Sequence, residues 1–306
     1  MVSDAPVTIT ACPACHATDA PQVGTAAAGF DTLVGGRQFH QPPYTVRACP
    51  ACGLYFKSAI LAPAELEAYY AALDSAPFEI DGDYPTDRRV RERLGALPDG
   101  SRVLDFGCNT GRILRPVTAR LECTGVEPNE AAAATARTRG IRIVAANELR
   151  DVQPFDAILL TDVFEHLLDP VPLLQDLAGK LAPRGWLAIV TGNADAIAAR
   201  EWLAEFWYFR LPEHLVMLGE RHLAWLSTQL DLKLIEVHRC SHYRMPLGSR
   251  LRQGVQAFAY RQFRTAPRSA AARLMRITPR LSAAERWTTA PALTYGDDHV
   301  VAVFQR

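Results

Sequence analysis

Short apolar runs alternate with segments of helical apolar spacing over the central part of the chain. The apolar runs predict five strands, at residues 102–106, 121–126, 141–145, 155–160 and 186–191. The segments between them predict helices at residues 112–119, 129–139 and 171–181. Because strands and helices alternate in this way, the pattern predicts an α/β fold in which a parallel sheet carries helices on both faces.

The chain divides into three regions by the same pattern. Residues 1–62 contain many glycine and proline turns and predict a small domain of hairpins. Residues 63–99 predict a helical linker or lid, in which a helix at 63–71 begins with proline. Residues 100–306 contain the predicted sheet.

The last region also contains a long insertion. Two more strands are predicted, at residues 232–238 and 300–304, and a helical segment at about 241–296 separates them. A second linker helix is predicted at residues 86–97, after a polar loop at 74–84.

Four of the seven cysteines form two C-x-x-C pairs, Cys12 with Cys15 and Cys49 with Cys52. Two such knuckles complete a tetrahedral site of four thiolates, which is the geometry that structural zinc prefers. The alternatives are two disulfides or a redox motif. Disulfides fit poorly because the N-terminus lacks the features of a signal peptide. We therefore expect residues 1–62 to form a zinc ribbon with no catalytic role, since a closed site has no open coordination position.

A glycine turn follows the first predicted strand of the sheet. Gly107 and Gly111 let the backbone turn sharply and approach a ligand, and Asn109 takes the place of a further glycine. Glu127 ends the next strand, 20 positions after Gly107, where a carboxylate can bind ribose hydroxyls. Asp105, just before the turn, would repel a pyrophosphate but could hold a cationic ligand with an amino group. The turn therefore favours such a ligand over a dinucleotide.

At this point the sequence resembles the class I S-adenosylmethionine (SAM)-dependent methyltransferases. The matching motifs are residues 103–111, 126–128, 155–166, 181–186 and 211–215, and the resemblance covers 88–240 and 300–304. Residues 211–215 resemble a segment of ubiquinone-pathway and other small-molecule O-methyltransferases. Some sugar-modifying members of the family are similar in having an N-terminal C-x-x-C pair of motifs. The resemblance implies a Rossmann-like sheet of seven strands.

The resemblance also implies roles for the matching residues. Gly107, Asn109 and Gly111 would pack against the methionine part of SAM, and Asp105 would meet its ammonium group. The other implied cofactor contacts are Glu127 and Pro128 at the ribose, Asn147 at the adenine, and Thr161 and Asp162 beside the methyl group.

Two histidines are candidates for the base that a hydroxyl acceptor requires. His166 and His214 follow predicted strand ends, and imidazole has a pKa near the working pH. The alternative is that both are packed loop residues. A divalent metal is a further hypothesis, because Asp162, Glu165 and His166 would share one face if this segment were helical. Aromatic residues at 206–209 would line the acceptor pocket or bury an interface with the ribbon.

Charge is divided unevenly along the chain. The 33 basic and 33 acidic residues sum to a net charge of +0, but residues 241–290 contain ten arginines and one acid, Glu285. We expect helices with one apolar face there, formed by Leu247, Leu251, Val255 and Phe258. This segment is a lid, an arm of a homodimer, a site for an anionic acceptor such as a nucleotide sugar or carrier-bound intermediate, or a peripheral contact with an anionic membrane.

Two functional hypotheses follow. The first is a SAM-dependent methyltransferase acting on a small molecule or sugar in a biosynthetic pathway, at a hydroxyl oxygen, with nitrogen and carbon as alternative acceptor atoms. The second is a zinc-ribbon module that binds or methylates RNA or protein. Residues 7–48 contain only Arg37 and Arg47 as fixed positive charges, so we expect no nucleic-acid partner. No apolar run is long enough to span a bilayer, and we expect a cytoplasmic protein.

Overall fold

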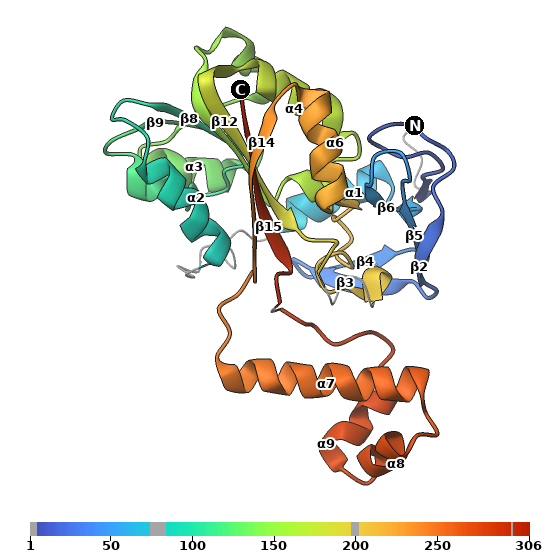
Figure 1. Ribbon diagram of the computed structural model, residues 1–306. Helices are drawn as coiled ribbons and strands as arrows, with labels where there is room; N and C mark the ends of the chain where they lie inside the picture. The colour runs from blue at the N-terminus through green and yellow to red at the C-terminus, as the bar shows by residue number, and fades with distance from the viewer. Residues whose placement is uncertain (1–4, 74–83, 197–201, 295) are drawn as a thin grey trace.

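The centre of the molecule is a sheet of seven strands. The structure is a computed structural model, and it describes residues 5–73, 84–196, 202–294 and 296–306. The strand order is β10-β9-β8-β11-β12-β15-β14. The strands are β8 (Arg102–Phe106), β9 (Glu122–Val126), β10 (Arg142–Val144), β11 (Phe155–Thr161), β12 (Leu181–Gly192), β14 (Lys233–Cys240) and β15 (His299–Gln305). All neighbours are parallel except β15, which is antiparallel to β12 and β14. The predicted seven-stranded sheet is confirmed (Figure 1).

Helices cover both faces of this sheet, as predicted. The helices are α2 (Pro85–Gly95) and α3 (Glu130–Thr138) on one face, and α4 (Pro170–Gly179) and α6 (Glu220–Leu230) on the other. Strand β11 shows why both faces are apolar: Ala157 and Leu159 pack on the α2 and α3 side, whereas Ile158 and Leu160 pack on the α4 and α6 side. Doubly covered parallel strands have apolar residues at every position for this reason.

One predicted helix is absent from the described residues. Residues 112–119 contain only the short 3-10 turn η2 (Arg115–Val117). Pro116 has no N–H with which to continue an α-helical ladder, so the segment stays a turn. The other connections with 3-10 geometry are η3 (Ala146–Asp151), η4 (Phe164–His166) and η5 (Leu203–Glu205). The loop predicted at 74–84 lies outside the described residues except for Tyr84.

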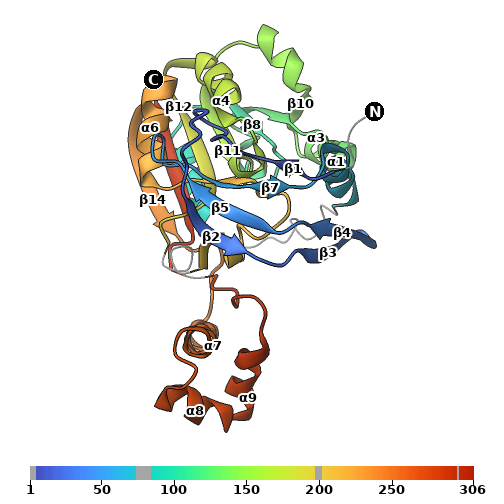
Figure 2. The ribbon, with the colours of Figure 1, turned by 90° about the vertical axis from the view of Figure 1, so that its right-hand side faces the viewer.

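The N-terminal region is built from hairpins, as its turns predict. Its strands are β1 (Val7–Thr8), β2 (Gln22–Ala26), β3 (Phe30–Val34), β4 (Arg37–Gln41), β5 (Tyr44–Ala48), β6 (Tyr55–Lys57) and β7 (Ala59–Ile60), and α1 (Pro63–Ala72) follows. Strand β13 (Val216–Met217), which belongs to the third region of the chain, pairs with β6 and joins the sheet β13-β6-β5-β2. Figure 2 shows this region lying against the main sheet.

The basic insertion forms an arm that projects from the body (Figures 1 and 2). It contains α7 (Leu247–Thr265), α8 (Ala270–Arg276), α9 (Pro279–Ser282) and η6 (Ala283–Arg286). Ala259 and Phe263 of α7 pack with Ala272 and Met275 of α8 in a small separate core. The four apolar residues predicted to share a face of this helix all lie on α7, and all are exposed, with exposed fractions of 72%, 63%, 49% and 50%. No helix of the described residues is both long and apolar enough to cross a membrane.

Candidate active site and cysteine cluster

The four cysteines of the two C-x-x-C pairs meet at one point. Their sulfur atoms all lie within 4.8 Å of one another. Cys12 Sγ is 3.5 Å from Cys52 Sγ, and Cys15 Sγ is 3.4 Å from Cys49 Sγ. All four are free cysteines, so the arrangement fits a tetrahedral thiolate site rather than two disulfides. Each knuckle closes with a backbone bond, from His16 N to Cys12 O and from Gly53 N to Cys49 O, both of 2.9 Å.

The knuckles also contact the main sheet region. His222 of α6 places Nδ1 3.0 Å from the carbonyl oxygen of Cys52, and the Arg221 guanidinium bonds to the carbonyl oxygen of Pro50. Gly53 has φ +79°, and a Cβ atom there would lie 2.9 Å from Arg221 Cβ. Only glycine allows both this backbone conformation and this close approach.

The glycine turn has the conformation that the sequence predicts. Gly107 and Gly111 have φ values of +81° and +79°, and Asn109 has φ +49°. A Cβ atom on Gly107 would lie 2.5 Å from Val163 Cγ2, and one on Gly111 would lie 2.0 Å from Ile141 Cδ1. Asn109 takes the left-handed conformation that asparagine tolerates best after glycine, which explains how it replaces a glycine in this turn.

Two carboxylates lie beside this turn. Glu127 accepts the backbone N–H groups of Asn109 and Asn129, each at 2.8 Å, which fixes its position at the end of β9. Asp105 is 2% exposed, and its Oδ1 has no hydrogen-bond partner among the described residues. Burial, and secondly Glu127, raise the pKa of Asp105 to about 7. A cationic ligand would supply a partner for the unpaired Asp105 oxygen and would offset the negative charge of the two carboxyl groups.

The other candidate cofactor residues lie at the carboxyl ends of neighbouring strands. Thr161 ends β11, and its buried Oγ1 has no partner among the described residues. Asp162 follows it with φ +53°. Asn147 is exposed in η3, directly after β10, and Pro128 is exposed after β9. These positions lie at the same edge of the sheet as the glycine turn, because the strands that they follow run parallel.

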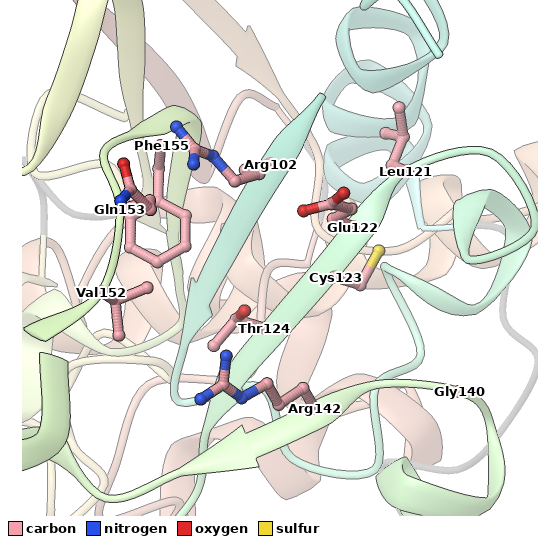
Figure 3. A pocket seen from close by; sticks show the side chains of 10 residues that line it. All are labelled: Arg102, Leu121, Glu122, Cys123, Thr124, Gly140, Arg142, Val152, Gln153 and Phe155. Atoms are coloured by element: carbon pink, nitrogen blue, oxygen red, sulfur yellow. The ribbon is translucent and has the colours of Figure 1, made fainter. Parts of the chain in front are cut away.

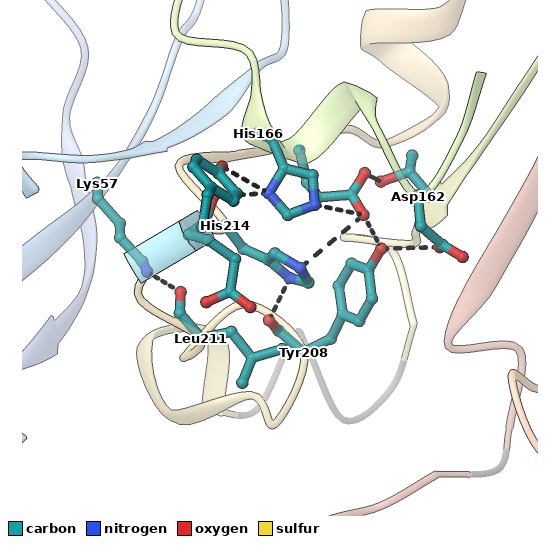
Figure 4. Close-up of polar contacts among 10 residues, drawn as sticks. Lys57, Asp162, His166, Tyr208, Leu211 and His214 are labelled. Carbon is teal, nitrogen blue, oxygen red and sulfur yellow. Dashed lines mark hydrogen bonds and ion pairs between the residues drawn. The ribbon is translucent and has the colours of Figure 1, made fainter. Parts of the chain in front are cut away.

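A network of polar side chains lies beyond Asp162 (Figure 4). The fully buried Glu165 accepts hydrogen bonds from the hydroxyl groups of Thr191, at 2.7 Å, and Tyr208. The Tyr208 hydroxyl also lies 3.1 Å from Asp162 Oδ1, so it joins the two carboxyl groups. Burial, and secondly Asp162, raise the pKa of Glu165 to about 8.

The two candidate bases meet at the same network. His166 Nδ1 is 3.1 Å from the Glu213 carbonyl oxygen, and His214 Nδ1 is 2.6 Å from the Tyr208 carbonyl oxygen. A carbonyl only accepts, so each Nδ1 carries the proton, and each Nε2, 3.9 Å from Glu165 Oε1, keeps its lone pair. Burial lowers the pKa of His166 to about 4 and that of His214 well below its usual value, so both are neutral at pH 7. The pKa near the working pH that we expected is therefore not found at either histidine.

The structure separates the three residues of the metal hypothesis. The helical turn η4 begins only at Phe164, and Asp162 lies outside it with a left-handed backbone. Glu165 and His166 therefore group with His214, whereas Asp162 groups with His242 and His299. The shared helical face that we expected does not form.

A buried lysine connects the N-terminal region to this site. Lys57 of β6 is fully buried, and its Nζ lies over the rings of Tyr44 and Phe209, at 5.0 and 5.5 Å. Nζ donates a hydrogen bond to the Leu211 carbonyl oxygen (Figure 4). The loop that contains His214 is therefore held by the ribbon.

The sequence alone pointed to neither His242 nor His299. They are far apart in the chain and meet because β14 and β15 pair antiparallel, with Cys240 opposite His299. The order of the last two strands was the available signal, since it brings the residues after β14 beside those before β15.

A surface pocket lies at the other end of the strands (Figure 3). It is lined by Arg102, Leu121, Glu122, Cys123, Thr124, Gly140, Arg142, Val152, Gln153 and Phe155. These residues lie at or near the starts of β8 to β11, whereas every predicted cofactor residue lies at or beyond the opposite ends. We assign this pocket no part of the site.

Comparison with known proteins agrees with this geometry. Residues 81–237 match a family model described as a methyltransferase domain. Ubiquinone biosynthesis O-methyltransferase of Caulobacter sp. (strain K31) is 35% identical over 119 residues, 35% of this chain and 47% of that protein. The enzyme of the same name from Idiomarina loihiensis is 28% identical over 159 residues, 46% of this chain and 64% of that protein. The chain thus spans about half the length of the first of these relatives.

A solved structure shows the same fold. A chain of the complex between the Haloferax volcanii Trm112 methyltransferase activator and a methyltransferase has a TM-score of 0.51 at 13% identity, covering 79% of this chain and 97% of that one. The family model covers more than half of the chain, and the matched residues include the glycine turn and strand ends described above. The chain therefore belongs to the methyltransferase-domain family, within the class I SAM-dependent methyltransferases.

Proposed function

We propose that the protein transfers a methyl group from SAM to an oxygen atom of a small molecule in a biosynthetic pathway. The observation that carries this proposal is the pair of carboxyl groups at the glycine turn. Asp105 offers a buried oxygen without a partner, which suits the ammonium group of SAM, and Glu127 suits its ribose. The residues present therefore fit the cofactor.

The remaining cofactor contacts come from the same end of the sheet. Gly107, Asn109 and Gly111 would pack against the methionine part, while Thr161 and Asp162 would border the methyl group. Pro128 would flank the ribose and Asn147 the adenine. When bound, SAM supplies an activated methyl group on a sulfonium, so the protein mainly has to align the acceptor and exclude water.

The acceptor loses a proton in this reaction. Its oxygen forms a bond to the methyl carbon as the carbon–sulfur bond breaks, and the electron pair of that bond leaves with the sulfur. His166 and His214 are neutral, as a base must be, and we propose that one of them takes the proton. His166 is the better placed, because its side chain is 24% exposed whereas that of His214 is 6% exposed.

The relatives support a small-molecule acceptor, because the Caulobacter and Idiomarina proteins are named ubiquinone biosynthesis O-methyltransferases. A sugar or anionic acceptor is a finer proposal. It is supported by the ten arginines of residues 241–290, since guanidinium groups bind phosphate and carboxylate in a bidentate manner.

We also propose that the four-cysteine cluster holds structural zinc.

We propose that the chain is divided into the three regions predicted from the sequence, 1–62, 63–99 and 100–306. The first and third regions are not independent, because strand β13 of the third belongs to a sheet of the first. A divalent metal on Glu165 and His166 receives less support, because both oxygens of Glu165 already accept hydroxyl groups.

Calorimetric titration of SAM into the purified protein tests the proposal. We expect one binding site, and an affinity at least tenfold weaker in Glu127→Ala. Glu130→Ala is the matched control, because Glu130 is an exposed acid on the adjoining helix that pairs with Arg137. A wild-type protein that binds no SAM, or a Glu127→Ala variant with unchanged affinity, would refute it.

A further inference from the structure

Two histidines and an aspartate from three separate segments converge beside the proposed methyl-transfer site. Asp162 follows β11, His242 follows β14, and His299 begins β15. One ligand atom of each lies within 4.8 Å of the other two. The two imidazole rings have centroids 4.2 Å apart. Sheet pairing fixes this arrangement, because β15 lies between β12 and β14.

One ring nitrogen of each histidine forms no hydrogen bond with any described residue. His299 is fully buried, and its Nε2 has no hydrogen-bond partner among the described residues. Nδ1 of His242 is also a buried atom without a hydrogen-bond partner among the described residues. An unpartnered polar nitrogen in a buried position is costly, so both atoms point to a group that the protein itself does not supply.

A second carboxylate, that of Asp298, holds the two histidines in position. Asp298 Oδ1 lies 3.3 Å from His299 Nδ1, and it also accepts the backbone N–H of His242, at 2.7 Å. A proton on His299 Nδ1 leaves the lone pair on Nε2. Histidines that bind metals are held in this way, with the distal N–H on a carboxylate.

We propose that Asp162, His242 and His299 form a binding site for a divalent transition-metal ion. Two imidazoles and one carboxylate favour Zn²⁺ and its first-row neighbours over Mg²⁺ and Ca²⁺, which prefer oxygen ligands. Tetrahedral zinc with bonds of about 2.1 Å places its ligands about 3.4 Å apart, so small side-chain rotations complete the geometry.

Three protein ligands leave at least one coordination position open. Asp162 and His242 are only half-buried, which gives an ion a path of entry. The rings of Trp207 and Tyr243 lie 5.9 and 4.4 Å from that of His242 and form an aromatic wall beside the site. If the proposed function holds, an oxygen atom of the acceptor would take the open position, but the binding of metal does not depend on that function.

The test titrates Zn²⁺ alone into the full-length protein by calorimetry, in the absence of SAM. We expect wild type to bind one more equivalent than His242→Ala or Asp162→Asn, whether or not the cysteine cluster is already filled. Asp298→Asn should retain the site but weaken it about tenfold or more, as loss of an orienting carboxylate does. His40→Ala is the matched control, because His40 pairs with Asp31 in an exposed hairpin and should change nothing.

Two results would overturn the proposal. One is an equal number of zinc equivalents in wild type and His242→Ala. The other is loss of the additional equivalent in His166→Asn while His242→Ala retains it, which would place the ion at Glu165. Circular dichroism melting of each variant establishes that it is folded, and SAM titration is added for His242→Ala, because Asp162 itself lies in the proposed SAM site. A variant that loses zinc but still binds SAM separates this proposal from that of the cofactor.

Discussion

Lys57 and Leu211 are 154 residues apart in sequence and are joined by a hydrogen bond of 2.6 Å from Nζ to the carbonyl oxygen. Lys57 belongs to the N-terminal hairpin region and Leu211 to the loop that leads to His214. A buried amine between two aromatic rings costs free energy unless it has a partner. The bond therefore ties the geometry of the candidate active site to the ribbon.

Substitution of Lys57 should change how stability depends on pH. Burial lowers the pKa of Lys57 to about 7, whereas an unfolded lysine has a pKa of about 10.4. Between these values the unfolded chain binds a proton that the folded chain does not, so this group makes stability rise with pH. The free energy of unfolding in urea at pH 7 and pH 9.5 should rise more in wild type than in Lys57→Met. Equal changes in the two proteins would contradict the burial argument.

Loss of the cysteine cluster should affect more than the ribbon. Cys49→Ser is expected to lose bound zinc and to lower the melting temperature, because metal binding supplies folding free energy. It should also lower methyl transfer, since β13, which follows the candidate active-site loop, pairs with β6 of the cysteine-containing region. Cys123→Ser is the control for removal of a buried thiol outside the cluster. Metal analysis and thermal melting check the result, and full activity without zinc would contradict it.

Gly111→Ala should disrupt the glycine turn more than Gly140→Ala does. Both glycines have left-handed φ values, +79° and +81°, so both substitutions add strain. Only at Gly111 would the new Cβ clash with a side chain, since it would lie 2.0 Å from Ile141 Cδ1; at Gly140 the nearest atom is 3.7 Å away, an ordinary van der Waals contact. We expect about 1 kcal/mol of destabilisation at Gly140 and a larger loss at Gly111, with weaker SAM binding. Urea titration compares the two.

Glu165→Gln should remove a fall in stability between acidic and neutral pH. Burial raises the pKa of Glu165 to about 8, whereas the ordinary value is about 4.3. Between these values the folded chain retains a proton that the unfolded chain has released, so this group makes stability fall as pH rises. Unfolding measured from pH 5 to pH 8 should show a weaker fall in Glu165→Gln than in wild type. Glu130→Gln, an exposed control, should keep the wild-type profile.

The parts of the site that lie on continuous motifs were readable from the sequence. Cys12 and Cys15, or Gly107 and Gly111, are close in the chain, so local turn geometry determines how they are placed. The strand ends at Glu127 and Thr161 follow from the alternation of strands and helices, because the carboxyl ends of parallel strands meet at one edge.

The side-chain contacts that depend on long-range strand pairing could not be predicted from the sequence. His299 meets His242 only through the β14 and β15 register, and Lys57 reaches Leu211 only because β13 pairs with β6. The apolar face of α7 was predicted correctly as a face, but the sequence did not show that it points to solvent. Helical spacing reports which residues share a face and not what that face contacts.

Strand β13 has a consequence for synthesis of the protein on the ribosome. The ribbon emerges first, but the edge of β6 has no β13 partner until residues 216 and 217 have been made. An unpaired strand edge is open to wrong partners during that interval. If the cysteine cluster binds zinc as proposed, early binding by the first 52 residues would stabilise the nascent hairpins until β13 has been synthesised.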